Sequence, residues 1–192
     1  MPRLWNDTIE SHRHAVHQAV LDTTAALVGA HGLAAVTMSQ IAKDVGIGRA
    51  TLYRYFPDVE SILTAWHDRQ IASHLDQLAR AGDAEPDPGG RLAAVLACYA
   101  RMSHGHHDPD LSRLLHRGQH VGRAQQRLRA YLTELIVDAA ATGEVRADLE
   151  PGALADYSLS ALTAAGAMPN DAAVDTLVGI ILTGLRPPAS AS

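Results

Sequence analysis

The side chains whose functional groups are best suited to binding a partner lie close together between residues 49 and 55. Their guanidinium and hydroxyl groups can bond to base edges or phosphate oxygens of a nucleic acid. These polar residues are Arg49, Thr51, Tyr53, Arg54 and Tyr55. Leu52 and Phe56 stand four residues apart, so a helix over 49–56 turns both inward and leaves the arginines and the threonine on its outer side. The segment is therefore a candidate nucleic-acid-binding surface.

A second short helix must position this one. Residues 38–45 have helical apolar spacing and end at Gly46, a residue suited to a left-handed turn. Thr37 with Gln40 three positions later forms a capping box, and Ile47 fills the space between the helices. Two short helices joined in this way predict a helix-turn-helix, whose second helix enters the major groove. Spacing alone leaves open an ordinary helical corner with solvated polar side chains.

The rest of the chain is also predicted to be helical. The 192 residues include 34 alanines but only five Tyr, two Trp and one Phe, which favours helices over a β-sandwich or barrel. The predicted fold class is all-α with about nine helices, at residues 8–30, 38–45, 49–56, 58–80, 92–102, 109–116, 121–142, 151–167 and 170–185. Residues 81–90, rich in Gly, Pro and acids, predict the most pronounced loop.

The charge and cysteine content exclude several classes of protein. A net charge of −5 rules out a uniformly basic coat, so any nucleic-acid contact must be a local patch. The one cysteine, Cys98, cannot form an intramolecular disulfide or a cysteine-based metal site, and its apolar neighbours predict a buried thiol. Because residues 1–7 contain no apolar run and no stretch reaches the length of a membrane span, we expect a cytoplasmic protein.

Two other clusters of polar residues are explained more simply as surface side chains than as binding sites. Histidines at 104, 106, 107, 116 and 120 invite a metal interpretation, but we expect solvated side chains and no metal, with a pH-sensitive surface left open. Arginines at 113, 117, 123, 127 and 129 offset the acidic C-terminal third; an anionic effector or a second nucleic-acid face are the alternatives. Ser158 and Ser160 lack a nucleophile context and no phosphate loop is present, so neither an enzyme nor a cofactor is expected.

Residues 37–57, followed by Glu60-Ser-Ile-Leu63, resemble the N-terminal domain of the TetR (tetracycline repressor) family. The resemblance spans about residues 10–65 and rests on the succession Thr–Ile-Ala–Val-Gly–Leu-Tyr-x-Tyr-Phe. By position it implies phosphate contacts from Thr37, Ser39, Tyr53 and Tyr55. It also implies that the recognition helix presents Gly48, Arg49, Ala50, Thr51 and Arg54. Two positions depart from the family: Gly48 replaces a frequent Ser or Thr, and Val59 replaces a common Lys.

The resemblance also implies how the chain is organised. Residues 1–57 would form the DNA-binding domain and residues 58–186 a helical effector-binding and dimerisation domain. Apart from the resemblance, the position of residues 187–192 at the chain end predicts a disordered tail. A small-molecule pocket in the second domain would draw on Trp66, Tyr99, Met102, His116, Gln119, Tyr157 and Met168. A homodimer would form through residues 152–167 and 171–185. The apolar residues that we expect at that contact are Leu154, Leu159, Leu162, Leu177, Ile180, Ile181 and Leu185.

The expected function is a ligand-responsive DNA-binding transcriptional regulator. Its partners would be a palindromic double-stranded operator and a small-molecule effector that releases the repressor from DNA. The alternative is a helical small-molecule-binding protein whose DNA binding is weak or lost, and Gly48 and Val59 are the residues that favour it.

Overall fold

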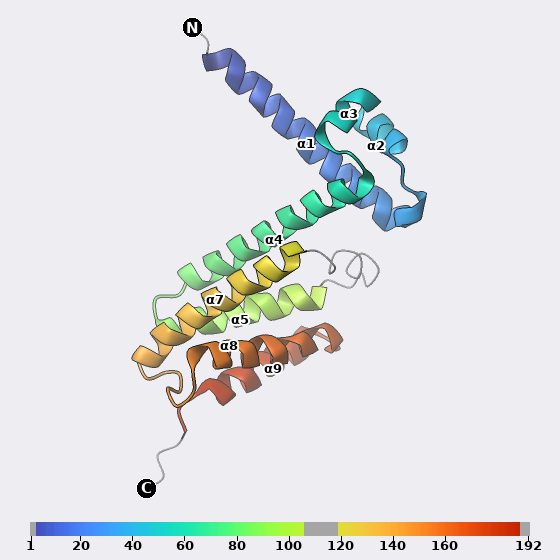
Figure 1. Cartoon of the computed structure of the whole chain (residues 1–192). Helices are drawn as coiled ribbons and strands as arrows, with labels where there is room; N and C mark the ends of the chain where they lie inside the picture. Colours follow the sequence, from blue (N-terminus) through green and yellow to red (C-terminus); the bar gives the residue numbers. More distant parts are fainter. Residues whose placement is uncertain (1–2, 106–118, 189–192) are drawn as a thin grey trace. The chain divides into compact units, whose positions relative to one another are not determined.

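The structure is a computed structural model. It describes the backbone of residues 3–105 and 119–188 and the side chains of residues 11–104 and 122–188. Within these ranges the chain forms eight α-helices, two short 3-10 helices and no strand, which confirms the all-α prediction (Figure 1). The helix predicted at 109–116 lies outside the described residues. No helix in the described part of the chain is long and apolar enough to cross a membrane.

The chain divides into two compact units, Met1–Ile71, here called the head, and Ala72–Ser192, here called the body. Helix α4, Val59–Asp83, contributes residues to both. Asp58 precedes α4, and its carboxylate accepts a hydrogen bond from the Ser61 N–H at 2.7 Å. This bond satisfies one of the N–H groups that the first turn of a helix leaves without an internal partner, so Asp58 caps α4.

The head contains helix α1, Arg3–His31, the 3-10 turn Leu33–Ala35, helix α2, Met38–Val45, helix α3, Arg49–Tyr55, and the first part of α4. Helix α1 ends at Gly32, whose φ of 77° suits glycine. In Figure 1 the first turns of α1 run on beyond α2 and α3. A small core joins these helices, made by Val20, Leu21, Val28, Val36, Met38, Ile41, Ala42, Leu52, Phe56, Ile62 and Leu63.

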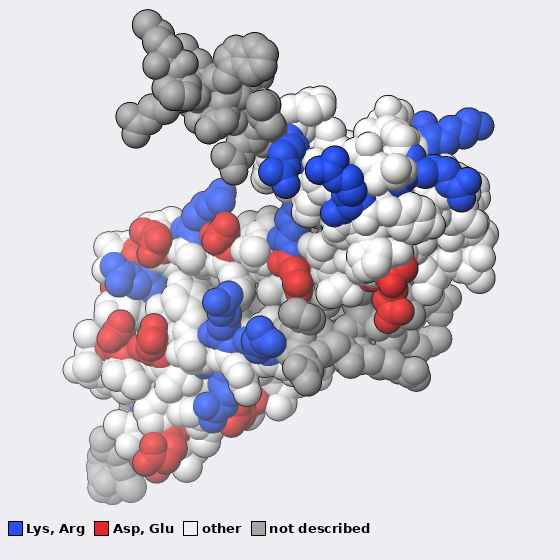
Figure 2. Space-filling model, turned by 45° about the horizontal axis from the view of Figure 1, so that its top comes forward, with Lys and Arg blue, Asp and Glu red and all other residues white. Residues whose placement is uncertain are grey.

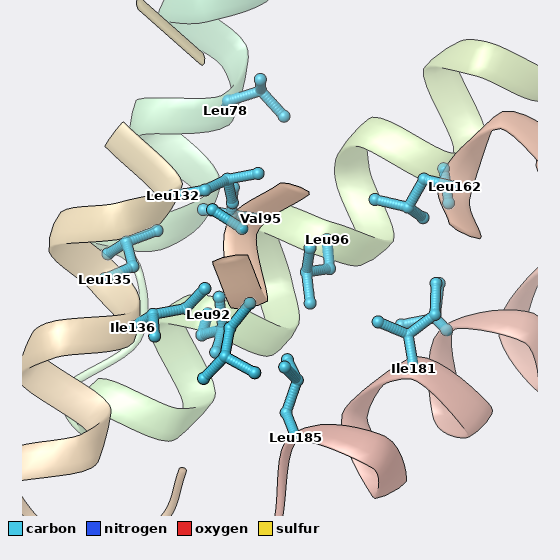
Figure 3. Packing of buried hydrophobic residues seen from close by; sticks show 14 of the residues in the cluster. Leu78, Leu92, Val95, Leu96, Leu132, Leu135, Ile136, Leu162, Ile181 and Leu185 are labelled. Atoms are coloured by element: carbon cyan, nitrogen blue, oxygen red, sulfur yellow. The ribbon is translucent and has the colours of Figure 1, made fainter. Parts of the chain in front are cut away.

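The body packs helix α5, Pro88–Gly105, against α7, Gln119–Ala141, α8, Pro151–Leu162, and α9, Asp171–Leu185. Figure 3 shows apolar side chains from these helices and the end of α4 meeting in one core. The labelled members are Leu78, Leu92, Val95, Leu96, Leu132, Leu135, Ile136, Leu162, Ile181 and Leu185. The 3-10 segment Thr163–Ala167 follows α8, so the helix predicted to reach residue 167 ends earlier as an α-helix.

The loop predicted over residues 81–90 is shorter in the structure. Helix α4 continues to Asp83 and α5 begins at Pro88, which leaves four linking residues. Proline suits the first position of a helix because its missing N–H would have had no partner there. The Asp87 carboxylate accepts from the Gly90 N–H at 2.7 Å, and Glu144 accepts from the Gly89 N–H at 3.3 Å. The Gly and Pro residues thus belong to a capped helix start.

Part of the predicted dimer contact is wrong. Leu154, Leu162, Ile181 and Leu185 are all buried in the core of the body itself, between 0% and 3% exposed. Because α9 must cover that core, one of its faces is already occupied. Ile180, next to Ile181 in sequence, points the other way and remains 61% exposed. The outer face of α9 is therefore the one that contains Ile180.

Candidate nucleic-acid interface

Helix α2 and the turn after it have the predicted local geometry. Thr37 is the N-cap, with an extended backbone, and its side-chain oxygen accepts from the Gln40 N–H at 3.3 Å. The helix ends at Gly46, whose φ of 76° and ψ of 29° lie in the left-handed region. The Ile47 N–H donates to the Ala42 carbonyl at 2.9 Å, which closes the turn. The chain is thereby directed into α3.

Helix α3 has the predicted inner and outer faces. Leu52 is 0% exposed and Phe56, just after the helix, is 5% exposed. Its cap residue, Gly48, is exposed, has an ordinary φ of −66° and provides no side-chain bond to the helix. The exposed residues of α3 are Arg49, Ala50, Thr51, Tyr53 and Arg54. The side chains proposed to bind nucleic acid therefore share the solvent side of α3.

The cations of this region are available to an external anion. Lys43, Arg49 and Arg54 are exposed, and among the described residues none of them forms an ion pair with a carboxylate. In Figure 2 the Lys and Arg side chains of the head gather on its upper face, whereas Asp and Glu lie along its lower side. Within an acidic chain, this arrangement gives the head a local positive surface, the kind of field that attracts a phosphate backbone.

Tyr55 is held against α1 by an aromatic contact that sequence patterns did not indicate. The centroid of the His17 ring lies 6.4 Å from that of Tyr55, edge to face, and 5.0 Å from that of Phe56. Burial, and then the nearby charges of His14 and Arg69, lower the pKa of His17 below its ordinary value of 6.5. The neutral imidazole thus packs on the C-terminal end of α3 and fixes the half-buried Tyr55 ring.

Arg69 connects α4 to the same part of α1. Its guanidinium donates to the Gln18 side-chain oxygen and to the Asp22 carboxylate, from 51 and 47 residues away in sequence. Side chains on one stretch of α1, residues 17–22, therefore contact both α3 and α4. Such contacts join segments far apart in the chain, so no local pattern predicts them.

The residues predicted to bind an effector belong to several segments of the chain. Tyr99 and Met102 on α5 and Met168 after α8 are partly buried against the core of the body. Trp66 lies in the head part of α4, and the exposed Tyr157 places its hydroxyl over Gly184 on α9. The side chains of His116 and Gln119 lie outside the described residues. Effector binding by this set stays a prediction.

Two family models match the chain, one in the head and one in the body. Residues 20–65 match "Bacterial regulatory proteins, tetR family", and residues 87–187 match "Transcriptional regulator SbtR-like, C-terminal domain". The repressor LfrR of Mycolicibacterium smegmatis is 32% identical over 85 residues, which cover 44% of this chain and 41% of LfrR. The regulator BetI of Rhizobium meliloti is 30% identical over 79 residues, 41% of this chain and 39% of BetI. Each alignment thus spans less than half of the relative.

Solved structures share the fold across most of the chain. A TetR/AcrR regulator from Thermobifida fusca has a TM-score of 0.70 and 19% identity, covering 88% of this chain and 98% of its own. FadR from Bacillus halodurans has a TM-score of 0.71 and 17% identity, with 90% and 97% covered. AibR in complex with isovaleryl coenzyme A and operator DNA has a TM-score of 0.63 and 18% identity, with 91% and 100% covered. Since the match over residues 87–187 alone covers more than half of the chain and the N-terminal match covers the helix-turn-helix, the protein belongs to the TetR family of bacterial transcriptional regulators.

Proposed function

We propose that the protein is a repressor that binds a near-palindromic operator as a homodimer and is released by a small molecule. The observation that carries the DNA-binding role is the outer face of α3. There Arg49 and Arg54 flank Thr51, exposed and without a described carboxylate partner, while Leu52 anchors the helix from the inside. Arginine forks onto a guanine edge or onto phosphate, and threonine bonds to either and packs on the thymine methyl.

Binding to duplexes selected from a random library by the protein itself tests this role. If a dimer neutralises about six phosphates, log K should fall with a slope of roughly −5 against log salt. The selected duplex should also bind more tightly than one of scrambled sequence. Equal affinity for both duplexes, or an affinity that does not depend on salt, would contradict the proposal.

Substitutions in α3 separate sequence reading from phosphate binding. Arg49→Ala or Thr51→Ala should cost roughly 1–3 kcal/mol on the selected duplex and relax the sequence preference. Tyr55→Phe should weaken binding to all sequences by about the same factor, because phosphate contacts carry no sequence information. Arg80→Ala, at an exposed position in the body part of α4, is the control and should change neither. If Arg49→Ala lowered the affinity for both duplexes by the same factor, Arg49 would not read bases.

The outer faces of α8 and α9 support the homodimer. Ile180 is 61% exposed, and a side chain added at Gly179 would meet nothing within 4 Å. The exposed Tyr157 crosses from α8 onto Gly184 of α9 and adds apolar surface to this face. A single head covers one short half-site, so pairing two heads about a two-fold axis provides the specificity that one lacks.

Two structural neighbours support a small-molecule effector. AibR was solved with isovaleryl coenzyme A and operator DNA, and FadR from Bacillus subtilis with stearoyl-CoA. In this chain Arg69 joins α4 to α1, so an effector that displaces α4 would act on the head through that contact. An effector changes DNA affinity only by its differential binding to two states, typically ~1–3 kcal/mol. Mass spectrometry of ligand that co-purifies with the protein from its native host tests this part of the proposal. The proposal would be contradicted if the protein carried no ligand and its affinity for DNA did not change in an extract of host metabolites.

A further inference from the structure

Helix α1 presents a cation next to the predicted DNA-binding face. Arg13 is exposed, it lies in the part of α1 before the core of the head, and it has no ion pair with a carboxylate among the described residues. It stands four residues before His17, so the two side chains share one face of the helix, with Cβ atoms about 5–6 Å apart.

The position of His17 fixes where that face points. Its ring packs on Tyr55 and Phe56, at the C-terminal end of α3. Side chains of a helix lean toward its N-terminus, so Arg13 extends from His17 away from the core and past the end of α3. Arg13 therefore lies one turn of α1 before the residue that packs on Tyr55, whose hydroxyl is a predicted phosphate contact.

The charges of the head agree with this placement. In Figure 2 several Lys and Arg side chains gather on the upper face of the head. Asp22, the one carboxylate of α1 whose side chain the structure describes, is bound by Arg69. Among the side chains that the structure describes, no carboxylate pairs with Arg13, so its guanidinium can take an external anion on the side of the head where α3 ends.

We propose that α1 is part of the DNA-contacting surface, with Arg13 binding a phosphate beside the one held by Tyr55. The proposal rests on the DNA-binding role proposed above. A phosphate contact carries no sequence information, so Arg13 adds affinity for every duplex and extends the footprint of each head beyond α3.

The salt dependence of binding tests Arg13 on two labelled duplexes, one selected from a random library and one of scrambled sequence. Each phosphate contact adds about −0.9 to the slope of log K against log salt, so Arg13→Ala in both heads should make the slope shallower by about 1.8. The advantage of the unmodified protein over Arg13→Ala should then be about twelve times larger at 50 mM salt than at 200 mM salt. Arg13→Lys keeps the charge and should keep most of the slope.

Two controls separate this contact from a structural effect. His12→Ala changes the adjacent exposed residue of α1, on a different side of the helix, and should leave the slope unchanged. Melting temperatures of all variants should agree, because Arg13 is exposed and contributes no core packing.

The possible outcomes distinguish this proposal from the proposed function. If the unmodified protein binds the selected duplex with a steep salt dependence and Arg13→Ala has the same slope, the Arg13 contact is refuted while the regulator role stands. If the unmodified protein binds neither duplex, both proposals fail. A shallower slope for Arg13→Ala on both duplexes, restored by Arg13→Lys, supports the contact.

Discussion

Ile180 and Ile181 are the same residue type at adjacent positions of α9, but they lie in different environments. Ile181 is 1% exposed in the core of the body and Ile180 is 61% exposed on the outer face. Replacing each by alanine removes the same atoms from two different environments. The pair therefore separates folding of one chain from association of two.

The expected magnitudes follow from these exposures. Ile181→Ala should destabilise the fold by about 2–5 kcal/mol, because it leaves a cavity in a packed core. Full burial of an isoleucine side chain is worth about 1.5–3 kcal/mol, and Ile180 has about three fifths of its surface left to bury. Two copies across a two-fold axis would then contribute about 2–4 kcal/mol to dimerisation, or about 30- to 700-fold in the dissociation constant.

Sedimentation equilibrium over a range of protein concentrations measures the dissociation constant, and chemical denaturation measures folding. We expect Ile180→Ala to raise the dissociation constant of the dimer by that factor. At protein concentrations below the dissociation constant, where the protein is monomeric, its free energy of unfolding should stay within about 0.5 kcal/mol of that of the unmodified protein. A dissociation constant for Ile180→Ala within twofold of the unmodified protein would refute the assignment of this face. An unmodified protein that stays monomeric at micromolar concentration would refute the dimer and the palindromic operator together.

Three further predictions concern the head and the expected absence of a metal. Gly46→Ala should destabilise the head by about 1 kcal/mol, because a φ of 76° strains any residue with a side chain, although no atom lies within 4 Å of the added Cβ. Gly48 has an ordinary φ of −66°, so Gly48→Ser should cost no stability. Denaturant titrations measure both changes. The lowered pKa of His17 means that the unfolded chain takes up its proton first, so stability is full above about pH 6.5 and falls as the pH drops toward the lower folded value. Melting temperatures between pH 7.5 and 5 should therefore fall less for His17→Phe than for the unmodified protein, and an equal fall would remove the role of His17. Dialysis against a chelator should leave the melting temperature unchanged; a loss restored by zinc would indicate a metal site.

Local signals in the sequence predicted the head well. The cap at Thr37, the turn at Gly46 and the inward Leu52 each depend on residues within a few positions of one another. The contacts of His17 with Tyr55 and of Arg69 with Asp22 join residues 38 and 47 positions apart, so they follow from tertiary packing alone. The roles of these side chains in binding DNA remain predictions.

The sequence of α9 could not show which of its faces meets the core. Its apolar residues lie on both sides, and Ile180 and Ile181 are indistinguishable by type. The structure resolves the ambiguity because α5 and α8 pack on the side of Val174, Val178 and Ile181. The linking segment after α4 is shorter than the sequence predicts for another reason: its Gly and Pro residues are typical of loops but also of the first turn of a helix.

Two reactive types of side chain, lysine and cysteine, occur once each in the sequence. Lys43, exposed on α2, is the one lysine of the whole sequence, and Cys98, partly buried on α5, is the one cysteine. Lys43 lies among the cations proposed to face DNA, so a lysine-reactive reagent applied with and without operator DNA would report whether DNA covers this part of the head. A thiol reagent would report on the body at Cys98 in the same way, with and without candidate effectors, and neither measurement needs a substitution.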